Sequence, residues 1–122
     1  KTKTLEFAGA NNGLYILRNN DLIETKPDKQ PVGNYENAKP FTNHKLQLET
    51  NDLIYLFTDG FADQFGGDKG KKYKYKPFKN LLSNLKENPI QSQGTLIDTE
   101  FDRWRGDLEQ IDDVCIIGVK IA

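Results

Sequence analysis

The sequence is short of sulfur-containing residues, with no methionine and one cysteine, Cys115, among 122 residues. A single cysteine excludes an internal disulfide framework, which suits a reducing compartment inside a cell. Cys115 stands between Val114 and Ile116, so we expect a small buried side chain and not a nucleophile. The absence of methionine, together with a strand-like pattern that begins at Thr4, predicts a segment of a longer protein.

Long apolar runs and a strong charge imbalance are also missing. No run approaches the length of a membrane span, and the first residues have no signal-peptide pattern. The formal net charge is −1, so nothing global attracts nucleic acid or anionic lipid. We therefore expect one cytoplasmic domain with no membrane segment and no nucleic-acid partner.

The first half of the sequence has the alternating period that is typical of strands. Asn19-Asn20 can form a tight turn with positive φ, and the proline-containing stretch Lys26–Asn43 predicts a long loop. Leu53–Phe57 is apolar on both faces, which favours a central strand that ends at Thr58-Asp59-Gly60. The other expected strands are Thr4–Ala8, Leu14–Arg18, Asp21–Thr25 and a short one around Leu46 and Leu48.

Two helices are predicted in the second half, followed by a last strand. Phe78, Leu81, Leu82 and Leu85 follow the i, i+3, i+4, i+7 spacing of one helical face. The second helix is expected to begin at an Asn88 cap with Pro89 in its first position and Gln91 in a capping-box role, to carry its apolar face on Ile97, Phe101, Trp104 and Leu108, and to end at Gly106. Val114–Ile121 reads as a buried strand. The fold class is therefore α+β with a mainly antiparallel sheet and two helices.

Acidic residues stand at both ends of the expected strand pair. Asp59 closes the central strand and Asp112 precedes the last one, so antiparallel pairing would bring the two carboxylates to one sheet edge. Convergent carboxylates are ligands for Mg²⁺ or Mn²⁺, and Gly60 would allow the backbone to approach closely. The alternative is an Asp-Gly turn and a solvated acid. Asp63 would lie near Asp59 after one helical turn, although a polar turn explains it equally.

A lysine-rich run within residues 69–79 follows these acids. It could attract phosphate near the acidic edge or bind single-stranded nucleic acid, or it could be a solvated face on a mobile segment. We expect the loop Lys69–Lys76 to be mobile and close to the acidic edge, with Lys69, Lys71 and Lys72 as candidate phosphate or substrate contacts. His44, the one histidine, has no partner for nucleophilic catalysis and is expected at the surface. The run consists of Lys69, Lys71, Lys72, Lys74, Lys76 and Lys79, with Tyr73 and Tyr75 interleaved.

The text "IYLFTDGFADQFGG", followed downstream by "QIDDVCIIGVKI", resembles the SpoIIE-like branch of the metal-dependent PPM serine/threonine phosphatases. Supporting similarity lies in "LEFAGANNGLYIL" and in the proline–glycine loop that leads into Thr-Asp-Gly. The resemblance implies a protein phosphatase 2C-like α/β/β/α sandwich. It also implies two Mn²⁺ or Mg²⁺ ions and hydrolysis of phosphoserine or phosphothreonine in a regulatory protein of bacterial signalling, such as sigma-factor regulation.

By the same resemblance, the aspartate of Thr-Asp-Gly is Asp59 and the late metal aspartate is Asp112, with Asp113 and Asp63 as less favoured ligands. No further catalytic side chain is implied beyond the metal ligands. The family's earlier Asp-Gly motif has no counterpart here. Residues 1–122 are thus expected to be the C-terminal portion of one domain, inactive alone and able to self-associate through the cut face. The parent could be tethered to a membrane sensor, and the rival reading is a non-catalytic protein-interaction module.

Overall fold

The computed structural model describes residues 3–34 and 36–122. The chain divides into two compact units, one formed by Lys1–Phe57 with Ile117–Ala122 and the other by Thr58–Ile116. Within the described residues, no helix is long and apolar enough to cross a membrane. The mixture of antiparallel strands and helices confirms the predicted α+β class.

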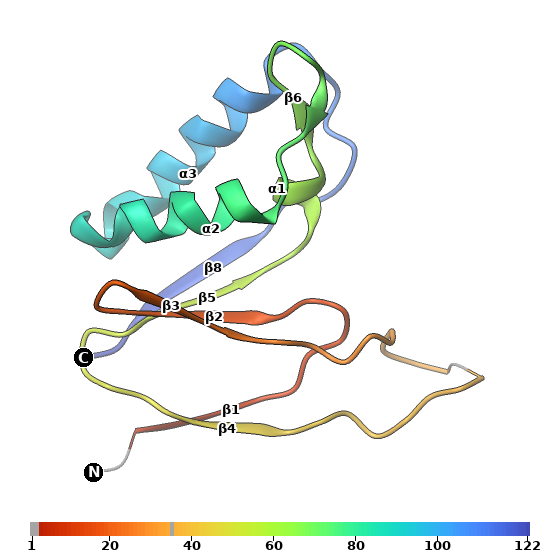
Figure 1. The fold of residues 1–122 in the computed structure, drawn as a ribbon, viewed down its shortest axis with the longest axis vertical. Coiled ribbons are helices and arrows are strands. Elements are labelled where there is room, and N and C mark those ends of the chain that lie inside the picture. The colour runs from red at the N-terminus through yellow and green to blue at the C-terminus, as the bar shows by residue number, and fades with distance from the viewer. Residues whose placement is uncertain (1–2, 35) are drawn as a thin grey trace. The chain divides into compact units, whose positions relative to one another are not determined.

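The first unit is built on a four-stranded sheet with the order β3-β2-β5-β8 (Figure 1). Strand β2 (Leu14–Arg18) pairs antiparallel with β3 (Asp21–Thr25) and with β5 (Leu53–Phe57). Asn19 has a φ of 55°, which confirms the predicted positive-φ turn between β2 and β3. The β5–β8 pairing is antiparallel too, because the residues before β5 are bonded to the residue after β8. Asn51 N donates to Ile121 O, and Ile121 N donates to Asp52 O.

A second, two-stranded sheet packs against one face of the first. Strand β1 (Thr4–Phe7) pairs antiparallel with β4 (His44–Gln47), and their alternating pattern turns one set of side chains inward. Fully burying an aliphatic side chain contributes about 1.5–3 kcal/mol, so these partly buried side chains each stabilise the unit by less than that. The inward residues Leu5, Phe7, Leu46 and Leu48, with Ile121, pack on Leu14, Ile16 and Ile54.

A buried ion pair fixes the turn that leads into β5. Arg18 donates from Nε to Asp52 Oδ1 at 2.9 Å and from Nη2 to Asp52 Oδ2 at 2.7 Å. These bonds from the guanidinium hold the pKa of Asp52 below its usual value. The same carboxylate accepts a hydrogen bond from Glu49 N. Asp52 therefore stabilises the turn before β5 and also pairs with Arg18 of β2.

The predicted long loop between β3 and β4 is present and is closed by its own polar side chains. Gln30 is buried, and its amide donates to Lys39 O and accepts from Lys39 N. Asp28 accepts from the backbone N and the hydroxyl of Thr42. His44, at the end of this loop, is half-buried beside the ring of Phe7, so it has the expected surface position only in part.

The second unit is a set of short elements around one aromatic side chain. Phe61 is fully buried, with ring centroids at 5.0 Å from Tyr73 and 5.2 Å from both Phe78 and Phe101. Each partner comes from a different part of the unit, so Phe61 joins them all. The elements are α1 (Gly60–Asp63), β6 (Phe65–Gly66), β7 (Lys71–Lys72), α2 (Tyr75–Asn84), a 3₁₀ turn at Leu85–Glu87 and α3 (Ile90–Arg105).

The predicted start of the second long helix was wrong by one residue, since Pro89 is the N-cap and not the first helical residue. Helix α3 begins at Ile90, and Asn88 has extended backbone angles and ends the 3₁₀ turn. The buried amide of Gln93 donates to Leu85 O and Asn88 O. This side chain therefore supplies the hydrogen-bond donor for the carbonyl groups between the 3₁₀ turn and α3. The predicted end is correct, because Gly106 terminates α3 with a φ of 56°.

The last strand is shorter and more exposed than expected. Strand β8 covers Ile116–Lys120 and lies at the end of the sheet order, with β5 as its one neighbour within the described residues. An edge position leaves one side of a strand uncovered. Cys115 precedes the strand and is exposed, and Leu108 lies beyond α3 and is exposed, so both expectations of burial were wrong.

Candidate functional site

Thr58 joins the segment after β5 to the segment before β8. Its backbone N donates to Cys115 O at 3.0 Å. Its hydroxyl donates to Asp113 O at 2.9 Å and accepts from Cys115 N at 3.1 Å. These three bonds set the Thr-Asp-Gly sequence directly beside residues 112–115.

Gly60 allows this approach to be very close. A Cβ atom at this position would lie 2.3 Å from Asp113 O and 2.9 Å from Asp113 C. Both atoms are backbone, so the contact could not be relieved by a side-chain rotation. Only glycine fits between the start of α1 and the Asp113 carbonyl.

Replacing Gly60 with alanine is expected to push residues 112–113 away from Asp59. We expect a loss of about 1–3 kcal/mol in the free energy of unfolding, the usual cost of overpacking. Chemical denaturation measures it, with Gly94→Ala in α3 as the control. A Cβ at Gly94 would meet nothing within 4 Å, so the control should be neutral or stabilising. Equal stability of Gly60→Ala and the native chain would contradict the role of this contact.

The structure brings Asp59, Asp63 and Asp112 together. Asp59 lies at the N-terminal end of α1 without capping it through its side chain, and Asp63 N donates to Asp59 O at 2.9 Å. Burial, the negative charges of Asp63 and Asp112, and a hydrogen bond with Asp112 all raise the pKa of Asp59. Asp63 and Asp112 are therefore both close enough to Asp59 to disfavour its charged form.

The two acids before β8 have different surroundings. Asp112 lies near enough to Asp59 to raise the pKa of that acid, and its Oδ1 accepts from Asp113 N at 2.7 Å. Asp113 instead contributes its carbonyl, which meets Thr58 and faces Gly60. This arrangement favours Asp112 over Asp113 as the partner of Asp59.

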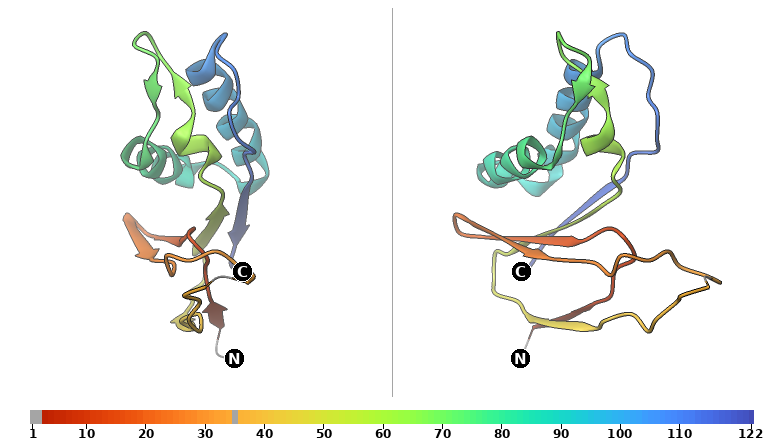
Figure 2. Two further views of the ribbon diagram at one scale, coloured as in Figure 1. Left: turned by 90° about the vertical axis from the view of Figure 1, so that its right-hand side faces the viewer. Right: turned by 45° about the vertical axis from the view of Figure 1, so that its right-hand side comes forward.

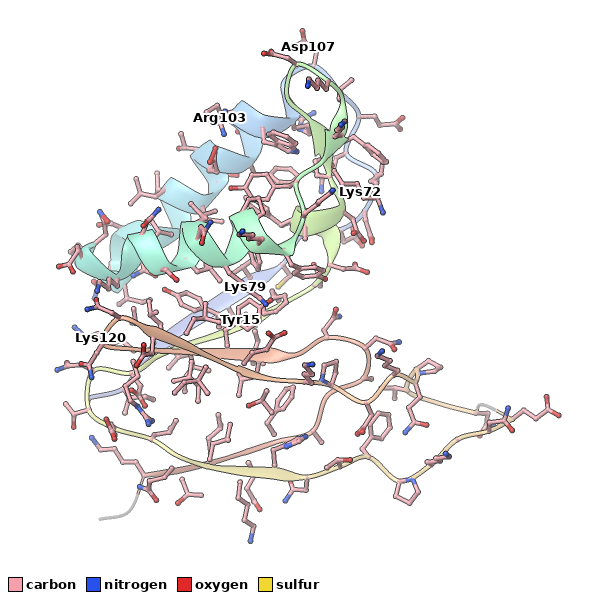
Figure 3. The ribbon with its side chains drawn as sticks, in the orientation of Figure 1. Tyr15, Lys72, Lys79, Arg103, Asp107 and Lys120 are labelled. Atoms are coloured by element: carbon pink, nitrogen blue, oxygen red, sulfur yellow. The ribbon has the colours of Figure 1, made fainter. Side chains whose placement is uncertain are left out.

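The basic segment is more ordered in its contacts than the predicted loop. Residues 71–72 form β7, Tyr73 is buried, and α2 already begins at Tyr75, so Lys69–Lys76 is not a structureless loop. Lys72 is the lysine that reaches the acids, with its Nζ 3.7 Å from Asp63 Oδ1 (Figure 3). Lys69 is an exposed side chain of the turn before β7, and Lys71 is an exposed side chain of β7 itself. Mobility of this segment remains a prediction.

Tyr75 is a further neighbour of the acids that the sequence did not reveal. Burial, and then the charges of Asp59 and Asp63, raise the pKa of its hydroxyl. In the sequence Tyr75 was one of two tyrosines interleaved with lysines, and nothing separated it from Tyr73. Tyr73 has a different place, since burial and the charge of Glu100 raise its pKa to about 12.

The donor atoms suit a hard divalent cation, although the ligand set is small. Carboxylate oxygens are the preferred ligands of Mg²⁺ and Mn²⁺, and Mg²⁺ is commonly bound by one or two carboxylates with waters and substrate phosphate. Within residues 3–34 and 36–122, no group of three or more His, Cys, Asp or Glu side chains is arranged to hold a metal ion. Asp59 and Asp112 thus form a pair that fits such an ion in chemistry and offers it two protein ligands.

The family described as Stage II sporulation protein E (SpoIIE) matches residues 1–122, the whole chain. The chain belongs to the SpoIIE family. A search of curated proteins found no significant match.

Solved structures similar to this SpoIIE-family chain are PP2C-type phosphatase domains. The SiaA-PP2C domain of Pseudomonas aeruginosa is 27% identical with a TM-score of 0.89, and the match covers 98% of this chain and 47% of that one. The phosphatase domain of the cell fate determinant SpoIIE from Bacillus subtilis is 18% identical with a TM-score of 0.65, over 98% of this chain and 58% of that one. A Mn-presoaked structure of that Bacillus domain is 19% identical, with a TM-score of 0.65 and coverage of 99% and 56%.

These matches confirm the predicted relationship to PP2C-like phosphatase domains and the predicted fold. The chain spans about half the length of the structures it matches. The roles of Asp59, Asp112, Asp113, Asp63 and the lysines are not tested by them and stay predictions.

Proposed function

We propose that this chain is part of a Mn²⁺- or Mg²⁺-dependent protein serine/threonine phosphatase, in which Asp59 and Asp112 hold metal. The observation that carries the proposal is the convergence of the segments that hold these two acids, which Thr58 and Gly60 bring together through their contacts with residues 113 and 115. Three neighbouring acids repel one another, and a divalent cation would offset their charges.

The acids of this site would have different roles in metal binding. Asp59 and Asp112 bind the cation, and Asp63 adds negative charge one helical turn away, where Lys72 partly offsets it. The bound cations would supply a water-derived nucleophile at neutral pH and neutralise charge on the phosphoryl group. Thr58 and Gly60 would orient the two carboxylates through their contacts with residues 113 and 115, and Gly60 would keep the backbone close to the metal. Ligands beyond this pair would come from elsewhere in the complete protein.

The substrate we propose is a regulatory protein phosphorylated on serine or threonine, in bacterial signalling of the kind that controls sigma factors. Cations that activate water need no side-chain nucleophile, and this agrees with a sequence that offers no Ser/His/Asp or Cys/His pairing. The setting we propose is cytoplasmic, with the complete protein free or tethered to a membrane sensor.

Metal removal tests this function in the complete protein. Treatment with a chelator should abolish hydrolysis of a phosphoserine peptide, and Mn²⁺ should restore it while Ca²⁺ should not, because Ca²⁺ prefers more ligands and longer bonds. Phosphate release measures the rate, and calorimetric titration measures metal binding separately. Hydrolysis that survives complete metal removal would contradict the proposal. Metal-loaded protein without any hydrolysis would favour the interaction-module alternative.

A further inference from the structure

The charges of this chain are strongly segregated around the lysine-rich stretch. Residues 69–79, hereafter the basic segment, contain six lysines and no acidic residue, in a chain whose net charge is −1. Lys72 pairs with Asp63. Lys69, Lys71, Lys74 and Lys76 are exposed, and none of them forms an ion pair within the part of the chain that the structure describes.

The basic segment is fixed to the element that carries the acids. Tyr73 N donates to Gln64 O at 3.0 Å, and Lys74 N donates to Ala62 O at 2.8 Å. The Tyr73 ring packs edge-on against Phe61 and Trp104 at 5.0 and 5.2 Å. The lysines on either side of Tyr73 therefore have backbone positions that are set relative to α1, which begins after Asp59 and ends at Asp63.

The β6–β7 hairpin, whose second strand lies in the basic segment, is also bound to α3. Figure 2 shows it beside the last turns of that helix, where Gly67 N donates to Trp104 O at 3.0 Å. A Cβ at Gly66 would lie 2.0 Å from Trp104 O, so the hairpin backbone lies directly on the helix end. Trp104 in turn donates from Nε1 to Gln64 O at 2.8 Å.

The electrostatics of this surface favour an anionic partner. Helix α2 begins immediately after Lys74, with Lys76 in its first turn and no acid there. The N-terminal end of a helix carries a partial positive charge, so lysines at this end are repelled by it and destabilise the helix. Lys74 also has a φ of 75°, a conformation that asparagine or glycine adopts more easily. The surface thus concentrates like charges that an external anion would offset.

We infer that the basic segment is a docking surface for acidic residues that flank the phosphorylated side chain of the protein substrate. The inference rests on the proposed function and names the sequence class that its site prefers. The acid Asp63 lies next to the middle of the segment, since Lys72 Nζ is 3.7 Å from Asp63 Oδ1 and Lys74 N donates to Ala62 O at 2.8 Å. A substrate whose phosphorylated residue meets Asp59 thereby brings neighbouring residues over Lys69, Lys71, Lys74 and Lys76.

The test compares substrates of different flanking charge in the complete protein. We would measure kcat and KM for a phosphoserine peptide with three flanking acidic residues, for the same peptide with alanine flanks, and for p-nitrophenyl phosphate. The variant is Lys69→Gln/Lys71→Gln/Lys76→Gln. The control variant, Lys26→Gln/Lys29→Gln/Lys39→Gln, removes the same charge from exposed lysines of the first unit.

The expected result is a rise of about tenfold in KM for the acidic peptide in the basic-segment variant, from three exposed charge contacts. Its kcat and both other substrates should change by less than about twofold, as should every parameter of the control. Equal KM values for acidic and neutral peptides in the native protein would overturn the inference. So would an equal loss for both peptides in the variant.

Direct binding separates failure of docking from failure of the proposed function. Fluorescence anisotropy with a labelled acidic peptide that carries aspartate in place of phosphoserine needs no turnover. Binding that weakens with the basic-segment variant and with salt supports docking even if no phosphatase activity is found. Absence of binding overturns it, and so does displacement by single-stranded DNA at a lower concentration than by the acidic peptide, because that marks a nucleic-acid surface. Lys69→Gln/Lys76→Gln, which spares the β7 pairing, repeats the measurement if the triple variant unfolds.

Discussion

Asp59→Asn is expected to lower phosphopeptide hydrolysis in the complete protein by more than about 100-fold, beyond the loss typical of residues that only support a metal ligand. Asp59 lies near Asp63 and Asp112, whose negative charges raise the pKa of its carboxyl group. An amide of the same size keeps the packing but removes the charge that would bind a divalent cation. The rate of phosphate release at saturating Mn²⁺ measures the effect.

Asp112 and Asp113 provide the matched comparison for this prediction. Asp112→Asn should cause a loss of the same order, and Asp113→Asn should retain activity within about tenfold because its carbonyl, not its carboxylate, makes the close contacts. Unchanged thermal unfolding of all three variants would show that the fold is intact. If Asp59→Asn retains native turnover, the metal role proposed for this pair is wrong.

Phe61→Ala is expected to lower the free energy of unfolding by about 3–5 kcal/mol, which is the usual cost of emptying a buried phenylalanine site. Phe61 is 0% exposed and contacts the rings of Tyr73, Phe78 and Phe101. Its loss therefore leaves a cavity shared by α1, the basic segment, α2 and α3. Denaturation followed by the fluorescence of Trp104, the one tryptophan of this chain, measures the change.

Phe65→Ala is the control for Phe61, since it removes the same side chain four residues away. Phe65 is 39% exposed and has Lys72 Nζ 5.9 Å from its ring centroid. We expect a loss of less than about 1 kcal/mol, as for most surface substitutions. Similar losses for the two variants would mean that Phe61 does not hold the second unit together.

Periodicity was sufficient for most elements of the first unit. Leu14–Arg18 and Asp21–Thr25 form strands with the predicted bounds, because alternating and fully apolar patterns each leave one stable way to bury the side chains. The end of α3 was equally readable, since Gly106 adopts a positive φ. The start of α3 could not be read in the same way. Asn88 and Pro89 fit a helix cap by residue type, but the side chain that binds the carbonyl groups of Leu85 and Asn88 belongs to Gln93.

The motif itself identified the acids, and the tertiary structure decided their grouping. The sequence by itself determined that Asp59 and Asp112 stand at the ends of two strands, and that Thr-Asp-Gly and Asp-Asp resemble those of SpoIIE-like phosphatases. It favoured Asp112 by resemblance but left Asp113 open, because adjacent residues share every local pattern and differ only in the direction of their side chains. Hydrogen bonds from Thr58 to the backbone of the 113–115 segment, and the space left by Gly60, turn the Asp113 carbonyl inward and leave the Asp112 carboxyl beside Asp59. The same holds for Tyr75 and Lys72, whose nearness to the acids depends on packing between residues that are far apart in the chain, which no local pattern records.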